Sequence, residues 1–371
     1  MAEVVRGRGA IGDVVASLAG SECVIFGGQT SFEASGASRA MDRLVGAGGR
    51  VLRVRGPLPT TEEVDRLVGE IGDEIPSTLV AVGGGLVIDV MKVVGLSLAT
   101  GKNAAEIVAR GSETAGEVPF MVAAATTAGS GAERTPFAVL YQDGIKHSVD
   151  DHRLLPDRVV LDPALSRTVP KPVAAAAALD ALAHCVESTW ACRSTDASQA
   201  VALDALARLS RDIEPGVVHG DEEARDQLLY AASDAGDAIA RTRTTAAHAL
   251  SYHLTSEYHI AHGHAVALTL GLLASYNEAV DGSTVTDPRG VAHVRSSVSA
   301  AFESVGVTDA AHLTNRLREL MAVMGLAPEV DAAAGQRVDR EQWVSEVNPE
   351  RLANNPRKLT HADLLRLVQA A

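Results

Sequence analysis

Five histidines lie close together between residues 248 and 264, a density that favours a metal site. Upstream, the segment LDALAHCVE places Asp180 and His184 four residues apart, and residues at this spacing share one face of a helix. One carboxylate with two or three imidazoles can enclose a divalent transition metal and leave a position open for a substrate. The two segments together predict a metalloenzyme. The five histidines are His248, His253, His259, His262 and His264.

Both signals also have simpler explanations. An Asp and a His four residues apart are often only a surface pair, and clustered histidines can be solvated residues on a helix face. The sequence around Asp180 and His184 is rich in alanine and apolar, so unpaired charge would be costly there, which weighs against a surface pair. Glu187, about one turn further on, is expected either to support a ligand or to cap a helix.

Two glycine-containing segments follow apolar runs and are candidates for nucleotide binding. Gly83-Gly84-Gly85 comes directly after the run 78–82, and TTAGSGAE (126–133) follows the run 120–125. Glycine lets the backbone approach a phosphate, and a helix start offers free N–H groups. The first segment is not the GxGxxG fingerprint, so a tight turn that packs a helix on a sheet is the alternative. Because both segments would open at the carboxyl edge of a parallel sheet, we favour a cofactor site.

The order of the patterns predicts two domains. Up to about residue 165, short apolar runs alternate with helical patterns, which favours a parallel α/β sheet. From residue 171 the chain is rich in alanine and leucine with helical periodicity. We therefore expect an α/β domain at 1–165 and an all-helical domain at 166–371. The apolar runs span residues 23–26, 51–54, 78–82, 120–125 and 158–162.

Local signals refine this outline. Thr60 and Glu63 predict a capping box at the start of a helix. The pair Asp143-Gly144 between two extended runs predicts a hairpin. The segment 331–342 is expected to be a loop or a short linker.

Composition excludes several classes of protein. The chain has 371 residues, of which 46% are hydrophobic and 3% aromatic, and its formal net charge is −14. This balance argues against a nucleic-acid partner, which would require a basic face. Three scattered cysteines favour free thiols in a reducing cytoplasm. No run approaches 18 apolar residues and the first residues lack a signal-peptide pattern, so we expect no membrane span and a cytoplasmic location.

The motifs, in this order, resemble the iron-dependent (group III) alcohol dehydrogenase family over nearly the whole chain. That resemblance implies an N-terminal dinucleotide-binding α/β domain with a parallel sheet, an all-α C-terminal domain, a metal in the cleft and a homodimer. The same two-domain plan occurs in dehydroquinate synthase. The matching segments are GGGLVIDVMK (83–92), TTAGSGAERT (126–135), Lys146 in GIKHSV, LLPDRVVLDPAL (154–165), LDALAHCVES (179–188), HALSYHLTSEYHIAHGHA (248–265) and NNPRKLT (354–360).

The resemblance also implies site residues. A divalent metal, Fe(II) before Zn(II), is expected on Asp180, His184, His248 and His262, although this donor set suits several divalent ions. Lys146 is expected near the nicotinamide ribose. Further cofactor contacts are implied for Gly84, Gly85, Asp89, Thr126, Thr127 and Ser130.

Four positions depart from the family pattern. Leu86 stands where a serine usually follows the three glycines, which removes one contact to the cofactor. Ala125 and Ala132 replace a proline and a serine. Tyr252 stands where many members have a histidine that is assigned to proton relay, and His253 is next to it, so the proton donor is left open.

Cofactor and substrate expectations follow from the same resemblance. Gly28 stands where relatives that prefer NADH have an acid, so NADPH is favoured over NADH. Segments such as GGQTSFEASG (27–36) resemble the phosphonoacetaldehyde reductase branch, which reduces phosphonoacetaldehyde to 2-hydroxyethylphosphonate. A phosphonate needs cationic partners, although a single arginine is more often only a surface residue. The candidates for substrate contact are Arg134, Arg241, Arg243 and His264.

The expected reaction is reduction of a small aldehyde to a primary alcohol. The metal would act as a Lewis acid on the carbonyl, and the nicotinamide would supply the hydride. Two alternatives remain: a non-redox lyase of the dehydroquinate-synthase type, which consumes no NAD(P)H, and a catalytically inactive paralogue. Another aldehyde or alcohol as substrate is also compatible with the sequence.

Overall fold

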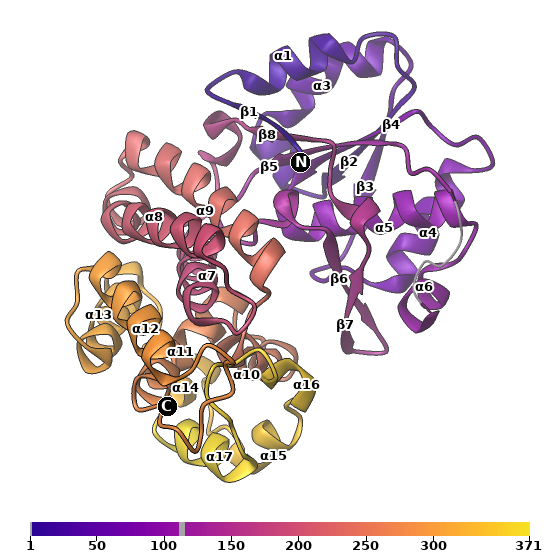
Figure 1. Ribbon diagram of the computed structural model, residues 1–371. Helices are drawn as coiled ribbons and strands as arrows, with labels where there is room; N and C mark the ends of the chain where they lie inside the picture. The colour runs from indigo at the N-terminus through magenta and orange to yellow at the C-terminus, as the bar shows by residue number, and fades with distance from the viewer. Residues whose placement is uncertain (1, 111–115) are drawn as a thin grey trace. The chain divides into compact units, whose positions relative to one another are not determined.

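The chain forms two compact units, Met1–Val169 and Pro170–Ala371. The structure is a computed structural model that describes residues 2–110 and 116–371. The first unit carries every strand of the two sheets and the second is helical (Figure 1). An α/β unit followed by a helical unit is the predicted fold class.

The first unit is built on a six-stranded, fully parallel sheet, and the parallel arrangement was predicted. Its strand order is β1-β8-β5-β4-β2-β3. The edge strand β1 was not predicted, because the four-residue segment EVVR shows no long apolar run; pairing with β8 defines it, with Val4 beside Val159. The strands are β1 Glu3–Arg6, β2 Cys23–Gly28, β3 Arg50–Val54, β4 Thr78–Gly83, β5 Phe120–Ala125 and β8 Arg158–Leu161.

Helices cover both faces of this sheet (Figure 1). On one face α1 and α3 pack on a core that includes Ile25, Val80 and Val122. On the other face α5 crosses β4 and β5 closely, because a Cβ on its Gly95 would lie 3.2 Å from Leu79 and 3.4 Å from Met121. The helices are α1 Ala10–Ser17, α2 Ser31–Ala34, α3 Ala37–Gly46, α4 Thr61–Ile71, α5 Gly85–Thr100 and α6 Ala104–Arg110, with short 3₁₀ turns at Ala132–Arg134, His152–Leu154 and Pro163–Ser166.

The strand order reverses between β2 and β4. The chain runs outward from β2 to the edge strand β3 and then returns to pair β4 on the other side of β2. In open parallel sheets, nucleotides bind outside the carboxyl ends of the strands at such a reversal. Here those ends are Gly28 of β2 and Gly83 of β4.

Two local predictions can be compared directly with the structure. The hairpin forms as β6 (Phe137–Gln142) and β7 (Ile145–Asp150), which pair antiparallel. At the start of α4, Thr60 Oγ1 accepts a hydrogen bond from the backbone N–H of Glu63, as expected. The Glu63 carboxylate, however, accepts from the backbone of Arg55, so the predicted box is only half formed.

The second unit is a helical bundle around α7. The helices α8, α9, α11 and α12 all contact α7, and α10 packs on α11. The predicted loop at 331–342 was wrong: α14 and α15 occupy most of it, because Asp339 caps the second helix by accepting from the backbone of Glu341 and Gln342. The helices are α7 Lys171–Trp190, α8 Asp196–Ile213, a π-helical turn at Glu214–Val218, α9 Glu222–Thr242, α10 Ala246–Ser256, α11 His262–Glu278, α12 Val291–Val305, α13 Ala310–Met324, α14 Val330–Ala334, α15 Arg340–Ser345, α16 Pro349–Leu352 and α17 His361–Gln369.

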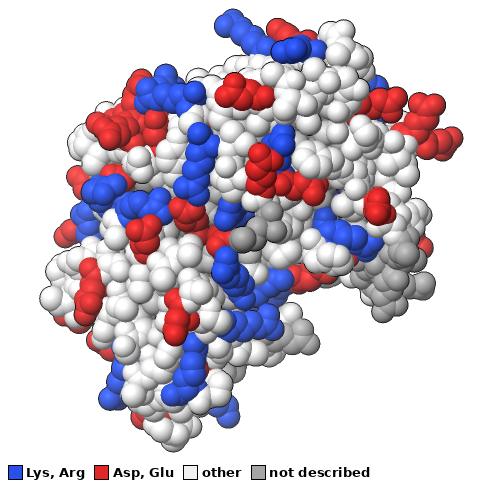
Figure 2. Space-filling model, turned by 45° about the horizontal axis from the view of Figure 1, so that its top comes forward, with Lys and Arg blue, Asp and Glu red and all other residues white. Residues whose placement is uncertain are grey.

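The surface carries charged side chains of both signs, as the composition suggests. Acidic and basic side chains are interspersed on the face shown in Figure 2. Among the described residues, no helix combines the length and the apolar character that crossing a membrane requires.

Candidate metal centre and nucleotide site

The Asp-His pair on α7 is buried, not exposed. Asp180 and His184 are 6% and 5% accessible to solvent, and both lie in the middle of the helix. Their spacing places the carboxylate and the imidazole on one face, with His184 Nε2 3.7 Å from Asp180 Oδ1. A surface pair is therefore excluded as the explanation of this motif.

Helices α10 and α11 bring two more imidazoles to the same carboxylate. His248 Nε2 lies 3.4 Å from Asp180 Oδ1 and His262 Nε2 lies 3.9 Å from it. Ligand atoms of Asp180, His248 and His262 all lie within 4.8 Å of one another. The His184 ring stacks on the His248 ring, with centroids 4.7 Å apart. The structure thus brings all four predicted metal ligands together.

Glu187 holds His248 in place and also caps the helix that carries it. One carboxylate oxygen contacts His248 Nδ1, and the other accepts from the backbone N–H of Thr245 and of Ala247 at the start of α10. The Thr245 hydroxyl donates to Glu187 and accepts from the indole N–H of Trp190. Glu187 therefore fulfils both roles that the sequence left open. With its Nδ1 directed to Glu187, His248 presents Nε2 to Asp180.

A serine orients His262 in a similar way. The Ser251 hydroxyl donates to the backbone carbonyl of His248 at 2.8 Å and lies 3.3 Å from His262 Nδ1. Because the Ser251 hydroxyl already donates its proton to His248 O, its oxygen can accept a hydrogen bond from His262 Nδ1–H, and His262 Nε2 faces Asp180.

Gly263 allows α11 to reach α7. A Cβ on this residue would lie 2.0 Å from the backbone oxygen of Ala176 and 2.6 Å from Asp180 Cβ. Only glycine permits this approach, and His262, the first residue of α11, thereby comes within reach of Asp180. This contact was not predicted, although the segment HGH places a glycine directly after His262.

The buried polar atoms of the cluster fit a cation. Asp180 Oδ1 and His248 Nε2 are buried and form no hydrogen bond with the described residues, an arrangement that is costly unless a further partner is supplied. Burial raises the pKa of Asp180, but His184, His248 and His262 outweigh it and lower this pKa. Burial lowers the pKa of His248, whereas Glu187 and Asp180 raise it to about 9. A carboxylate and imidazoles are the donors that Fe(II) and Zn(II) accept.

The remaining histidines of the segment have other surroundings. His264 Nε2 donates to the backbone oxygen of Ala327 at 2.7 Å, and burial lowers its pKa. His253 Nδ1 lies 2.6 Å from the Glu346 carboxylate, and His259 is an exposed loop residue with φ 55°. Tyr252 stacks on His262 with centroids 6.1 Å apart.

In the first unit, the two predicted nucleotide loops pack against each other. The backbone N–H of Thr126 donates to Gly83 O at 3.0 Å. A Cβ on Gly84 would lie 3.1 Å from Thr127 Oγ1, and one on Gly85 would lie 2.6 Å from Ser130 Oγ. At least part of the need for glycine is therefore loop packing. Gly84 precedes α5 and provides no side-chain cap.

Asp89 and Lys146 lie near the hairpin of the first unit. Asp89 Oδ2 accepts from the backbone N–H of Val139 on β6, and Lys92 Nζ lies 3.6 Å from Asp89 Oδ1. Burial raises the pKa of Asp89, and the charges of Lys92 and of Lys146 on β7 oppose this. Lys92 is fully buried and donates to both oxygens of Thr135 and to Phe137 O, which fixes the end of the second loop.

The predicted substrate arginines are distributed over both units. Arg134 ends the 3₁₀ turn that follows the second loop. Arg241 forms an ion pair with Asp237 at 2.8 Å. Arg243 follows α9 with φ 62° and precedes Thr245, the N-cap of α10.

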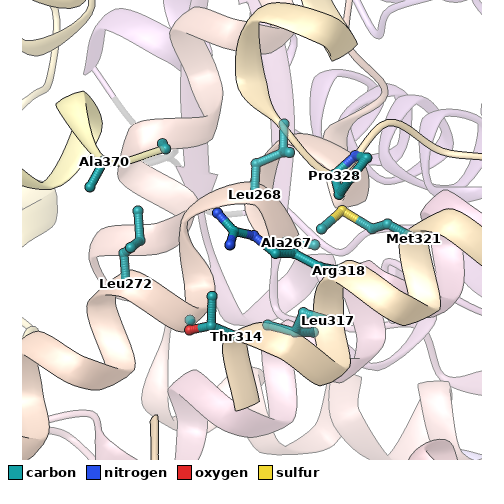
Figure 3. A pocket seen from close by; sticks show the side chains of 11 residues that line it. Ala267, Leu268, Leu272, Thr314, Leu317, Arg318, Met321, Pro328 and Ala370 are labelled. Atoms are coloured by element: carbon teal, nitrogen blue, oxygen red, sulfur yellow. The ribbon is translucent and has the colours of Figure 1, made fainter. Parts of the chain in front are cut away.

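A surface pocket of the helical unit lies between α11, α13 and the last residues of the chain (Figure 3). Leu268, Thr314, Leu317 and Met321 line it, with Arg318 beside them. None of the predicted site residues belongs to its lining.

A parallel α/β unit with glycine loops at its carboxyl edge, followed by a helical unit with a buried carboxylate among imidazoles, fits a metal-dependent enzyme that binds a nucleotide. The family model of iron-containing alcohol dehydrogenases matches residues 2–163, and that of the C-terminal part of the Fe-containing family matches residues 174–371. The chain belongs to the iron-containing alcohol dehydrogenase family. It is an alcohol dehydrogenase or aldehyde reductase.

Individual relatives agree with this assignment. The phosphonoacetaldehyde reductase of Streptomyces viridochromogenes is 35% identical over 329 residues, which cover 84% of this chain and 80% of the relative. An alcohol dehydrogenase of Thermococcus barophilus is 28% identical over 78% of this chain and 73% of the relative. The crystal structure of the iron-containing alcohol dehydrogenase of Thermococcus thioreducens is 26% identical, with a TM-score of 0.85 over 100% of this chain and 97% of that one.

Proposed function

We propose that the protein reduces a small aldehyde to a primary alcohol with NADPH and a divalent metal, and that its substrate is phosphonoacetaldehyde. The product would be 2-hydroxyethylphosphonate. The observation that carries the proposal is the cluster of Asp180, His248 and His262, whose ligand atoms lie within 4.8 Å of one another. The overall reaction consumes one aldehyde, one NADPH and one proton per alcohol and NADP⁺.

The metal would be held by Asp180, His184, His248 and His262, with Fe(II) as the favoured ion. When bound, it supplies Lewis-acid polarisation of the aldehyde carbonyl. Glu187 and Ser251 keep the Nε2 atoms of His248 and His262 directed to the site, and this preorganisation keeps the reorganisation cost small. Tyr252 stacks on His262 and places its ring beside the site.

The cofactor would bind at the reversal of strand order in the first unit. The loops Gly83-Gly84-Gly85 and 126–131 and the start of α5 would hold its pyrophosphate through backbone N–H groups. Thr126, Thr127 and Ser130 add hydroxyls, and Lys146 would contact the nicotinamide ribose. NADPH is proposed over NADH because Gly28 ends β2 without a carboxylate that would repel a 2′-phosphate.

The substrate proposal rests on the relative from Streptomyces viridochromogenes and on the need of a phosphonate for cations. Of the predicted arginines, Arg243 is the strongest candidate, because it directly precedes the capping segment of the helix that carries His248. Arg241 is already paired with Asp237, and Arg134 and His264 are weaker candidates.

The test measures NADPH oxidation with a panel of small aldehydes that includes phosphonoacetaldehyde, together with the metal content of the purified protein. We expect phosphonoacetaldehyde to give the highest kcat/KM and His262→Ala to lose both bound metal and turnover. His312→Ala, which removes an exposed histidine of α13, is the matched control and should retain both. Product formation without net NADPH consumption would favour the lyase, and His262→Ala with full metal content and turnover would refute the ligand assignment.

A further inference from the structure

The Arg53 side chain makes several contacts at the carboxyl end of β3. Its guanidinium lies over the ring of Phe32, 4.3 Å from the centroid. Nη1 donates to the backbone oxygen of Gly28 at 3.4 Å, and Nη2 forms an ion pair with Glu33. Arg66 fixes the backbone of the same residue by donating to Arg53 O at 2.7 Å. A long side chain that is normally mobile is thus ordered next to the last residue of β2.

The surroundings of Gly28 do not favour a carboxylate at this point. A Cβ on Gly28 would lie 2.4 Å from Ser31 Oγ, so the serine hydroxyl occupies the space in which an acidic side chain would begin. Where an acid ends this strand, it binds the ribose hydroxyls and repels a phosphate. In this chain a hydroxyl takes that place, and a third of the Arg53 side chain is open to solvent beside it.

The position along the sheet defines which part of a nucleotide would meet Arg53. Strand β2 is one side of the reversal in strand order, and Arg53 on β3 lies beside Gly27 in the parallel pairing. The adenosine ribose of a dinucleotide bound at such a reversal reaches the end of this neighbouring strand, and an arginine there accommodates a 2′-phosphate.

We propose that Arg53 binds the 2′-phosphate of NADPH and thereby sets the preference for the phosphorylated cofactor. This inference rests on the proposed function, in which the chain uses NADPH. The planar guanidinium pairs with two phosphate oxygens at once, which lysine cannot do.

Glu33 does not prevent this contact. Its side chain is 57% exposed and that of Arg53 is 33% exposed, and exposed ion pairs add little to stability because water competes for both charges. A phosphate dianion with two hydrogen bonds displaces the single carboxylate. The stacking on Phe32 persists, so the guanidinium keeps its orientation when Glu33 moves away.

The experiment compares two ligands that differ only in the phosphate in question. Adenosine 2′,5′-bisphosphate and adenosine 5′-monophosphate are titrated into the full chain by calorimetry. We expect the wild type to bind the bisphosphate at least about tenfold more tightly, a typical value for a charge-assisted phosphate contact. Arg53→Ala should lose this preference while its affinity for the monophosphate changes less than about twofold, and Arg53→Lys should retain part of it.

Two further variants make the result specific. Arg50→Ala removes an arginine from the other end of β3, where it donates to the carbonyls of Glu70 and Ile71, and should keep the wild-type preference. Glu33→Gln should bind the bisphosphate at least as tightly as the wild type, because the competing carboxylate is gone. Equal weakening of both ligands in Arg53→Ala, or an unchanged preference, would overturn the proposal; so would weaker bisphosphate binding by Glu33→Gln.

The two proposals fail in distinguishable ways. Neither adenosine ligand undergoes reduction, so the titration is independent of the aldehyde. A wild type that does not favour the bisphosphate refutes the role of Arg53, whereas aldehyde reduction with NADH remains possible. Absence of turnover with every aldehyde of the panel, together with the expected titration, refutes the proposed reaction and leaves the role of Arg53 standing.

Discussion

The two predicted sites of this protein differ in that one is formed by side chains and the other mainly by backbone. In the helical unit, side chains form the site, and other side chains hold them: Glu187 contacts His248, and Ser251 contacts His262. In the sheet unit, the predicted site is mainly backbone, formed by loops whose glycines let them pack on one another. The site in the helical unit therefore depends on the identity of a few polar groups, whereas the site in the sheet unit depends on the absence of side chains.

The largest effect on metal binding and stability is expected at Gly263, where the absence of a side chain lets a metal-site histidine approach Asp180. Gly263→Ala would place a methyl group 2.0 Å from the oxygen of Ala176, so α11 must move away from α7. We expect loss of bound metal and a decrease in the free energy of unfolding of about 3 kcal/mol, as is typical of strong overpacking. Metal analysis and urea unfolding measure both quantities.

Gly282→Ala is the matched control, because a Cβ there would meet nothing within 4 Å and the residue has no positive φ. It should retain metal and stability. Retention of metal by Gly263→Ala would show that contact between α7 and α11 does not position His262.

The next effect concerns the orientation of an imidazole. In the wild type, both carboxylate oxygens of Glu187 act as acceptors. In Glu187→Gln one of these oxygens is replaced by an NH2 group, which donates, so the side chain cannot accept both from the backbone of α10 and from His248 Nδ1. His248 would take the other tautomer and lose the Nε2 lone pair. We expect metal affinity to fall about 10- to 100-fold, the usual effect of losing such a partner, as measured by competition with a chelating dye.

Asp309→Asn changes a capping carboxylate of α13, a helix without predicted ligands, and should leave metal affinity unchanged. If Glu187→Gln bound metal as tightly as the wild type, the orienting role of Glu187 would be wrong.

A smaller effect is expected in the glycine loops. Gly85→Ala brings a Cβ to 2.6 Å from Ser130 Oγ, and the loops must separate. We expect cofactor affinity to fall about tenfold, equivalent to about 1.4 kcal/mol, with metal content unchanged. Fluorescence titration with NADPH measures the affinity.

A second substitution tests the cause. Gly85→Ala combined with Ser130→Gly should recover the affinity of Ser130→Gly alone, a reference that already lacks the hydroxyl proposed to contact the cofactor. Gly69→Ala, in open space on α4, should not weaken binding. Failure of the double variant to recover would mean that Gly85 serves by direct approach to the phosphate and not by loop packing.

The smallest effect is expected at Leu86, which is partly exposed at the start of α5. Leu86→Ser supplies the hydroxyl that the family usually has there. One neutral hydrogen bond contributes about 1 kcal/mol, so NADPH should bind about threefold to fivefold more tightly in the same titration. Weaker binding would show that the leucine side chain itself contacts the cofactor.

Site residues and strands could be predicted from the sequence where residue type and spacing act together. Asp180 and His184 were predicted because four residues bring side chains to one helix face, and buried strands such as β4 were predicted from continuous apolar runs. For Glu187 the sequence could not decide between supporting a ligand and capping a helix, because only the fold brings it next to residues 245–248. Arg53 gave no signal, because its importance depends on the strand order that places β3 beside β2 and on the hydroxyl of Ser31 near Gly28.

The double use of Glu187 has a consequence for metal loading in the cell. Its carboxylate is held by the start of α10 as well as by His248, so the imidazole stands ready before any ion arrives. The proposed set of one oxygen and three nitrogen donors would not discriminate strongly among first-row ions, and availability would then decide which ion binds. Protein produced in zinc-rich and in iron-rich medium should therefore carry different ions in the same scaffold.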